Sequence, residues 1–318
     1  MASLTPELFA ATQITEESPE IGGTDGSTKR PIIQRDTFLG EFPYVRFGSG
    51  RENLVILPGI TLENEPPNRL AAWTYRLGFG RFARAYTVYV INRRRGMPPG
   101  YTTQDMAQDY ARVIEGELGT SHVMGFSTGG SIAQYVALDH PEVVRSLLLI
   151  VSACRLSKEG RETCERWQAL TRRGRWQELR ADMAWVTVTS ETNKRLARAF
   201  MRFFGRFVIG TPRDPSDFLT TLQADLNHDT TGRLNEISAP TLIIGGSEDP
   251  FFSESILRET AGKIPDATLH VYDGVGHGVP KERKRRYEND TLAFIDDHLE
   301  GSSGRVGQTI SSPAKEMR

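Results

Sequence analysis

Short apolar runs recur along the chain, and amphipathic stretches separate most of them. The runs are LVILPG (54–59), TVYVIN (87–92), SHVMGF (121–126), SLLLIVS (146–152), TLIIGG (241–246) and ATLHVYD (267–273). They are apolar on both sides and rich in Val and Ile, as is typical of strands buried on both faces of a parallel sheet. The alternation therefore predicts an α/β protein with a mostly parallel central sheet and helices on both faces.

One interval interrupts the alternation. Helical patterns such as NKRLARAFMRFFGRF dominate there, no strand pattern occurs, and the interval is too long for a loop. The two ends of the chain are polar and lack the residues to bury a core. A leader folded across the mouth of an active site is left open. The predicted division is a flexible leader (1–30), a core in two segments (31–154 and 235–300), a helical insertion (155–234) and a flexible tail (301–318).

Composition argues against several classes of partner. The chain has 318 residues and a formal net charge of −1, so no global field favours nucleic acid or an anionic membrane. No apolar run approaches the roughly 20 residues of a membrane helix, and the N-terminus lacks the features of a secretory signal. Cys154 and Cys164 match no metal spacing and are interpreted as small core residues. We expect a cytoplasmic protein without nucleic-acid or membrane partners; a homodimer is left open.

Glycines crowd a single serine in the sequence Gly-Phe-Ser-Thr-Gly-Gly, where a predicted strand meets a predicted helix. A nucleophile at such a junction sits on a very tight turn, so the residues two before and two after it must lack bulk. Gly125 and Gly129 meet this need around Ser127. The helix N-terminus behind the serine favours negative charge on a bound oxygen. The segment predicts a nucleophilic serine, with a structural turn as the alternative.

The segment VMGFSTGGSIAQYVALDHPEVVRSLLLIVS resembles the nucleophile segment of α/β-hydrolase-fold enzymes. The likeness extends over most of residues 40–300, apart from the helical insertion, which resembles the cap of that family only in position and helical content. The resemblance implies an α/β-hydrolase fold with a cap inserted between strands, a catalytic Ser127, and no cofactor or metal.

The resemblance also implies a base and an orienting acid, in the chain order serine, acid, histidine. Of the six histidines, only His277 lies in a glycine-bracketed loop just after the last predicted strand, where the imidazole is free to reach another loop. The family pattern at the end of TLIIGGSEDPFF selects Asp249 as the acid, with Glu248 as the alternative. Asp249 would fix the tautomer of His277 and stabilise the imidazolium formed during attack.

The resemblance assigns an oxyanion hole to two backbone N–H groups. One belongs to Thr128, the residue after the nucleophile. The other belongs to Ile60, because Gly59 matches the glycine of the His-Gly loop of the family. Pro58 stands where the histidine is usual.

A second departure from the family pattern lies in INRRRGMPPG, where Arg93 replaces an acid. We interpret the three consecutive arginines of this segment as surface salt bridges, with a site for an acidic substrate group as the alternative.

The insertion offers candidates for the walls of a substrate pocket. Phe126 and Ile60 flank the predicted chemistry and are expected to touch substrate. Further candidates are Met183, Trp185, Phe200, Phe203 and Phe204, with packing inside the insertion as the alternative. We expect a mainly apolar acyl or alcohol group of modest size.

Together these features predict a serine hydrolase that cleaves an ester, thioester or lactone of a small acyl substrate through an acyl-enzyme. Perhydrolase chemistry like that of cofactor-free haloperoxidases, carbon–carbon bond hydrolysis and acyl transfer would use the same residues and remain alternatives. A non-enzymatic alternative is a small-molecule receptor on a hydrolase scaffold. A scaffold for partner proteins is a third class, supported only by the arginine-rich insertion and the tails.

Overall fold

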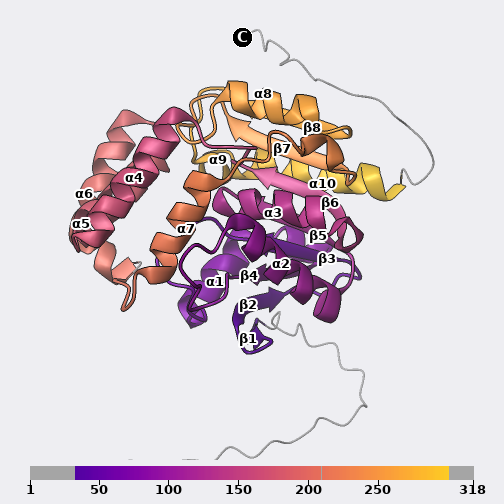
Figure 1. Ribbon diagram of the computed structural model, residues 1–318, viewed down its shortest axis with the longest axis horizontal. Helices are drawn as coiled ribbons and strands as arrows, with labels where there is room; N and C mark the ends of the chain where they lie inside the picture. The colour runs from indigo at the N-terminus through magenta and orange to yellow at the C-terminus, as the bar shows by residue number, and fades with distance from the viewer. Residues whose placement is uncertain (1–32, 209, 301–318) are drawn as a thin grey trace, which may run out of the picture. The chain divides into compact units, whose positions relative to one another are not determined.

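The computed structural model of the protein describes residues 33–208 and 210–300, and these ranges include one eight-stranded sheet. The strand order is β1-β2-β4-β3-β5-β6-β7-β8, as Figure 1 shows. The strands are β1 (Gln34–Phe38), β2 (Phe42–Phe47), β3 (Asn53–Leu57), β4 (Thr87–Ile91), β5 (Ser121–Phe126), β6 (Val144–Ile150), β7 (Thr241–Gly246) and β8 (Ala267–Tyr272). The predicted flexible leader and tail lie outside the described residues.

Strands β3 to β8 pair in parallel, and each coincides with one of the predicted runs. The mostly parallel sheet is therefore confirmed. The hairpin β1–β2 was not predicted; it adds an antiparallel edge to the sheet through β4. Its first strand, QRDTF, is polar and largely exposed. Its second strand is buried but contains Pro43, a residue that is unusual within a sheet away from its edges.

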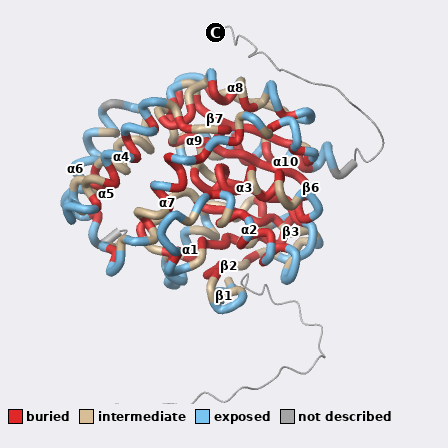
Figure 2. The backbone as a smooth tube through the Cα atoms, viewed as in Figure 1, coloured by how far each residue is buried: buried red, intermediate tan, exposed pale blue. Residues whose placement is uncertain are grey.

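Helices cover both faces of the sheet (Figures 1 and 2). Side chains of α2, α3 and α8 pack against one face, together with Val55 and Leu57 of β3. Side chains of α1 and α10 pack against the other face, together with Leu54 and Ile56. The alternation of neighbouring residues between the two clusters follows the period of a strand. These helices are α1 (Arg69–Gly78), α2 (Thr103–Val113), α3 (Thr128–Asp139), α8 (Glu254–Lys263), α9 (Val279–Glu282) and α10 (Lys284–Glu300).

The interval between β6 and β7 is helical, as predicted. It holds α4 (Lys158–Arg172), α5 (Trp176–Val186), α6 (Glu191–Val208) and α7 (Ser216–Asn227), at the left of Figure 1. No strand longer than an isolated bridge between Arg155 and Asp229 occurs in the described part of this interval. Helix α4 approaches the core closely, because a Cβ on Gly160 would lie 2.9 Å from Cα of Phe251.

Residues that leave β5, β7 and β8 at their carboxyl ends meet at one edge of the sheet, because these strands are parallel. This is the edge at which open α/β sheets bind their ligands. None of the helices in the described ranges has the length and apolarity required to cross a bilayer.

Candidate active site

Ser127 joins β5 to α3 in a strained backbone conformation, with φ 51° and ψ −120°. The turn is possible because three glycines surround it closely. A Cβ on Gly125 would lie 2.4 Å from the carbonyl oxygen of Gly129, and a Cβ on Gly129 would lie 2.1 Å from that of Leu57. A Cβ on Gly130 would meet the side chain of Ser152 at 2.4 Å. Positive φ in a non-glycine residue is characteristic of strained functional positions.

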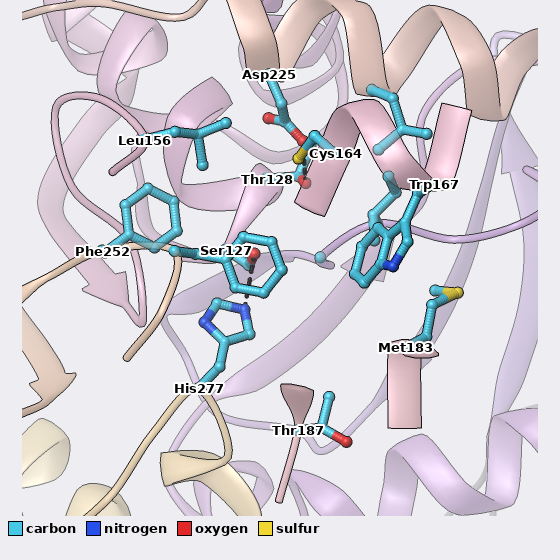
Figure 3. A pocket seen from close by; sticks show the side chains of 14 residues that line it. Ser127, Thr128, Leu156, Cys164, Trp167, Met183, Thr187, Asp225, Phe252 and His277 are labelled. Carbon is cyan, nitrogen blue, oxygen red and sulfur yellow. Dashed lines mark hydrogen bonds between the residues drawn. The ribbon is translucent and has the colours of Figure 1, made fainter. Parts of the chain in front are cut away.

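The side chains of Ser127, His277 and Asp249 form a continuous chain of hydrogen bonds. Nε2 of His277 lies 3.0 Å from Oγ of Ser127, the contact drawn as a dashed line in Figure 3. Nδ1 of His277 lies 2.8 Å from Oδ2 of Asp249. The structure thus brings together three residues that were predicted to meet, although Ser127 and His277 are 150 positions apart.

Backbone N–H groups hold the Asp249 carboxylate in place. Its Oδ1 accepts hydrogen bonds from the N–H of Phe251 at 2.8 Å and of Phe252 at 3.2 Å. The rings of these phenylalanines flank the imidazole, with centroids 4.7 Å and 6.1 Å from that of His277. Glu248 does not take this position, because the carboxylate bonded to the imidazole is that of Asp249.

The other histidines have different surroundings. His122 contacts Ser146 and Glu52, and His270 contacts Asp290. His298 bonds the carbonyl of Phe294, while His228 packs edge-on against Tyr135. The last, His140, lies 3.8 Å from Glu142. His277 alone among the described histidines is bonded to Ser127.

The loop after β3 borders the serine. A Cβ on Gly59 would lie 3.6 Å from Cβ of Ser127, and Gly59, Ile60 and Thr128 line the same cavity as the serine. Thr128 is the first residue of α3, where backbone N–H groups have no partner within the helix. The two N–H groups predicted as oxyanion donors therefore belong to residues that border Ser127.

The interpretation of the three arginines as surface salt bridges is wrong for Arg93. Arg94 and Arg95 do form surface ion pairs, with Glu41 and Glu65. The side chain of Arg93 is instead only 1% exposed.

Arg93 binds that loop directly. It donates hydrogen bonds to the carbonyl oxygens of Pro58 at 3.1 Å and Gly59 at 3.0 Å, and to Oγ1 of Thr61 at 2.8 Å. The two departures from the family pattern, at positions 58 and 93, are thus in contact. An arginine that holds backbone carbonyls occupies the position where the family has an acid, and the loop it holds lacks the usual histidine.

A cavity of about 200 Å³ opens over Ser127, and its lining is mostly apolar (Figure 3). The core contributes Ser127, His277, Phe251 and Phe252, and the helical insertion forms the opposite wall. The lining consists of Gly59, Ile60, Ser127, Thr128, Leu156, Cys164, Trp167, Met183, Thr187, Leu222, Asp225, Phe251, Phe252 and His277. Of the predicted substrate contacts, Ile60 and Met183 line the cavity.

Phe126 does not line this cavity. It precedes Ser127 on β5, and its ring packs on the opposite face of the sheet, 5.5 Å from the ring of Phe79 and 6.3 Å from that of Tyr287. Trp185 also lies elsewhere, since Lys194 and Arg198 of α6 stack on its ring at 5.3 Å and 5.5 Å.

The phenylalanines of α6 lie outside the cavity as well. Phe200 and Phe203 are 52% and 70% exposed, and Phe204 is exposed beside Phe200. Their helical spacing places them on one face of α6, but that face does not pack on α5 or on the core. Periodicity shows which residues share a face and leaves the direction of that face undetermined.

Sequence reasoning missed several residues of the wall. Cys164 and Trp167 follow each other at helical spacing on the buried face of α4, a periodicity that could have identified them. Phe251 and Phe252 directly follow the predicted acid. Asp225, on α7, gives no such signal, because an acid near the end of an amphipathic helix is ordinarily expected to be exposed to solvent.

Asp225 is a buried acid in contact with Thr128, the residue that follows Ser127. Its Oδ2 accepts a hydrogen bond from Oγ1 of Thr128 at 2.6 Å. Burial raises the pKa of Asp225 to about 6, although the hydrogen bond from Thr128 and the charges of Arg93 and His277 oppose that shift. The ionised carboxylate is therefore destabilised in the folded protein relative to water.

We expect Asp225→Asn to stabilise the folded protein at neutral pH. Because the pKa of Asp225 rises from its ordinary 3.8 to about 6 on folding, the unfolded chain loses this proton at lower pH than the folded protein does. Ionisation then costs the folded state on the order of 3 kcal/mol above pH 6, and the cost disappears below about pH 4. Asparagine keeps an acceptor for Thr128 without the charge.

The measurement is the free energy of urea unfolding of both proteins between about pH 3 and about pH 8, a range that spans the ordinary pKa of 3.8 and the raised pKa of about 6. The gain should grow as the pH rises through this range. A difference that is independent of pH, or a variant less stable than the wild type at pH 8, would contradict the assignment.

Comparison with known proteins identifies the family of the chain. The sequence profile of the Alpha/beta hydrolase family matches residues 54–288, which include Ser127, Asp249 and His277. The protein therefore belongs to the alpha/beta hydrolase family, and its fold is the α/β-hydrolase fold.

The chain is similar to proteins with different activities. It is 24% identical over 204 residues to the putative carbamate hydrolase RutD of Caulobacter vibrioides, covering 64% of this chain and 75% of that protein. It is 28% identical over 296 residues to the 2-hydroxy-6-oxononadienedioate/2-hydroxy-6-oxononatrienedioate hydrolase of Paraburkholderia phymatum, covering 85% and 93%. The crystal structure of the enol-lactonase from Burkholderia xenovorans LB400 superposes with a TM-score of 0.68 at 17% identity, covering 83% of this chain and 100% of that one.

Proposed function

We propose that the protein is a serine hydrolase that cleaves a carboxylic ester, lactone or thioester of a small, mainly apolar substrate through an acyl-enzyme intermediate. The observation that carries the proposal is the hydrogen-bond chain from Asp249 through His277 to Ser127, whose hydroxyl opens into a mostly apolar cavity. A serine hydroxyl bonded to an oriented imidazole is the arrangement that makes the hydroxyl nucleophilic near neutral pH.

Each group has a defined role in this mechanism. Oγ of Ser127 attacks the substrate carbonyl while Nε2 of His277 takes the proton, and His277 then passes that proton to the leaving group. Water deprotonated by His277 hydrolyses the acyl-enzyme in the second half of the cycle. Asp249 accepts the Nδ1–H hydrogen bond, which keeps Nε2 free as the base and stabilises the imidazolium.

The backbone N–H groups of Ile60 and Thr128 are proposed to hold the oxyanion, and Arg93 to position the first of them. The carbonyl of Gly59, which accepts a hydrogen bond from Arg93, belongs to the same peptide group as the N–H of Ile60. A cation on that carbonyl polarises the peptide and makes its N–H a stronger donor. Arg93 also fixes the loop through Pro58 and Thr61.

Arg93→Met should lower kcat with little change in KM, because the oxyanion forms only after attack begins. Removal of an oxyanion donor itself costs about 10²–10³ in kcat, so loss of its support is expected to cost about tenfold to a hundredfold. Steady-state kinetics on one ester would show it. Arg94→Met is the matched control, since that arginine pairs with Glu41 on the surface.

Guanidinium rescue separates this role from a general loss of stability. Added guanidine hydrochloride at millimolar concentration should partly restore kcat of Arg93→Ala and leave the wild type unaffected. Equal kcat for Arg93→Met and Arg94→Met, or an effect confined to KM, would contradict the role of Arg93.

The names of the relatives suggest other bonds for the same residues. A carbamate or a carbon–carbon bond next to a carbonyl is a substrate that this triad could also cleave, and perhydrolysis and acyl transfer would differ only in the attacking nucleophile. No Lys or Arg side chain lines the described cavity. This lining favours neutral substrates over dioates, which have two carboxylates to neutralise.

A panel of substrates tests the proposal. Short-chain esters, a lactone, a thioester, an N-alkyl carbamate and a 2-hydroxy-6-oxo dienoate would be compared by kcat/KM on the wild type and on Ser127→Ala. We expect the esters, lactone or thioester to be turned over fastest, with Ser127 required. Fastest turnover of the carbamate or of the dienoate would show that the bond cleaved is a carbamate or a carbon–carbon bond. Binding without turnover of any member would favour a small-molecule receptor.

A further inference from the structure

Asp225 lines the cavity over Ser127, and only one of its two carboxylate oxygens has a hydrogen-bond partner among the described residues. It reaches from α7 in the helical insertion toward Thr128 and Ser127 (Figure 3), and the residue is only 6% exposed. Its Oδ2 accepts the Thr128 hydroxyl hydrogen, but Oδ1 is buried without a hydrogen-bond partner among the described residues. Two carboxylate oxygens can together accept about four hydrogen bonds, so acceptor capacity remains.

The charges of Arg93 and His277 favour the ionised form of Asp225, but neither side chain contacts its carboxylate in an ion pair. Asp225 forms no ion pair with the residues described by the structure, and the nearby guanidinium of Arg93 is directed to the carbonyls of Pro58 and Gly59. A buried carboxylate that lacks partners is costly, and such groups are found mainly where function requires them. We expect the missing partner to come from a molecule in the cavity that Asp225 lines. Because Oδ1 itself has almost no accessible surface, the carboxylate has to rotate to receive that donor.

We propose that Asp225 is a specificity residue that selects substrates with a hydrogen-bond donor, a hydroxyl or ammonium group, close to the scissile carbonyl. The inference rests on the proposed function, because it assumes that the carbonyl lies between Ser127 and Thr128. The donor bonds Oδ1, the carboxylate oxygen that has no partner among the described residues. A substrate with a carboxylate at the same place meets like charge in a buried site and is rejected.

A purely structural role for Asp225 would be to fix Thr128. That role predicts an equal loss on every substrate when Asp225 is changed, because the oxyanion donor serves all of them. The specificity role predicts a change in the ratio of kcat/KM between two substrates that differ only in the hydrogen-bond donor. The ratio therefore distinguishes the two roles.

Pairs of matched esters measure the ratio of kcat/KM between a hydroxyl substrate and its methyl counterpart. The variable group is placed on the acyl chain in one pair and on the alcohol in the other. Methyl 3-hydroxybutanoate and methyl 3-methylbutanoate differ by a hydroxyl against a methyl on the acyl chain, and 2-hydroxyethyl butanoate and propyl butanoate differ in the same way on the alcohol. Methyl 3-aminobutanoate supplies an ammonium group, and monomethyl succinate supplies a carboxylate. Values of kcat/KM would be measured for the wild type, Asp225→Leu and Asp225→Asn.

We expect the wild type to prefer the hydroxyl over its methyl counterpart by about tenfold or more in at least one pair, and to use the succinate monoester least. Asp225→Leu should reverse the hydroxyl preference. Asp225→Asn, which retains an acceptor, should keep part of that preference while raising the relative rate on the succinate monoester. Asn227→Leu, an exposed change on the same helix, should keep the wild-type ratios.

Two results would overturn the inference while leaving the proposed function intact: equal turnover of hydroxyl and methyl esters by the wild type, or a hydroxyl preference that persists in both Asp225 variants. Absence of turnover of every ester, with no labelling of Ser127 by a fluorophosphonate, would instead overturn the proposed function and the inference with it. Circular dichroism of each variant checks the fold. If Asp225→Leu does not fold, Asp225→Asn decides the question through its relative rate on the succinate monoester, and an unchanged relative rate overturns the inference.

Discussion

Ser127→Ala is expected to lose roughly 10⁴–10⁶ in kcat and to keep its fold, since removal of a serine nucleophile leaves only the contribution of binding and the oxyanion donors. The substitution deletes one oxygen and retains Cβ, so the strained backbone at φ 51° is no more costly for alanine than for serine. The measurement is kcat on the best ester of the panel, together with the unfolding free energy.

Ser131→Ala is the matched control, because Ser131 is a buried serine one turn further along α3 and lies outside the cavity lining. It should retain wild-type kcat within a factor of a few. Turnover by Ser127→Ala within tenfold of the wild type would show that another group attacks the carbonyl, or that water does so directly.

Asp249→Asn is expected to lower kcat by about 10³–10⁴ while the protein stays folded. The amide of asparagine can donate its N–H to Nδ1 of His277, and the ring then carries its proton on Nε2, where it can no longer accept one from Ser127. The carbonyl oxygen of asparagine can still accept the N–H groups of Phe251 and Phe252, which bond Oδ1 in the wild type. The expected loss of kcat therefore comes from the wrong tautomer of His277 and not from a change in the loop that holds residue 249.

Glu248→Gln removes the neighbouring acid without touching the imidazole and is the control. It should retain near wild-type activity, as measured by kcat at pH 7 to 8. A larger loss in Glu248→Gln than in Asp249→Asn would assign the orienting role to Glu248.

The alternation of apolar runs and helices was sufficient to predict the parallel sheet, because strands buried on both faces must be continuously apolar. The tight turn at Ser127 was predictable for a related reason. At Gly125 and Gly129 a side chain would overlap the backbone, so the glycine spacing is a direct consequence of local geometry. The selection of His277 and Asp249 depended further on the family resemblance, and the structure places both within hydrogen-bond distance.

The wall of the cavity was much less predictable. Phe200 and Phe203 share a helical face, yet that face points to solvent, because the packing of α6 on α5 is decided by tertiary contacts. Phe126 adjoins Ser127 in sequence, but its ring packs on the face of the sheet away from the cavity, since neighbouring residues of a strand face opposite sides. Proximity in sequence to the chemistry was therefore a poor guide to substrate contact.

Arg93 and Asp225 show a second limit of sequence reasoning. Charged residues are usually exposed, so the run of three arginines was interpreted as surface salt bridges, and no role was predicted for Asp225. Their burial follows from long-range contacts, with residues 35 and 97 positions away. Both charges lie beside the proposed oxyanion site, where buried charge has its largest effect on chemistry.

Covalent labelling tests directly whether Ser127 is a nucleophile that His277 activates. It requires no knowledge of the substrate. A fluorophosphonate would be incubated with the wild type and with His277→Ala, and the adduct would be located by mass spectrometry of peptides. We expect a single adduct on the wild type, on Ser127. It should form at least about 10²-fold more slowly in His277→Ala, because a general base contributes about 10²–10⁴ to the rate. An adduct on a different residue, no adduct on the folded wild type, or equal labelling rates in the two proteins would contradict this expectation.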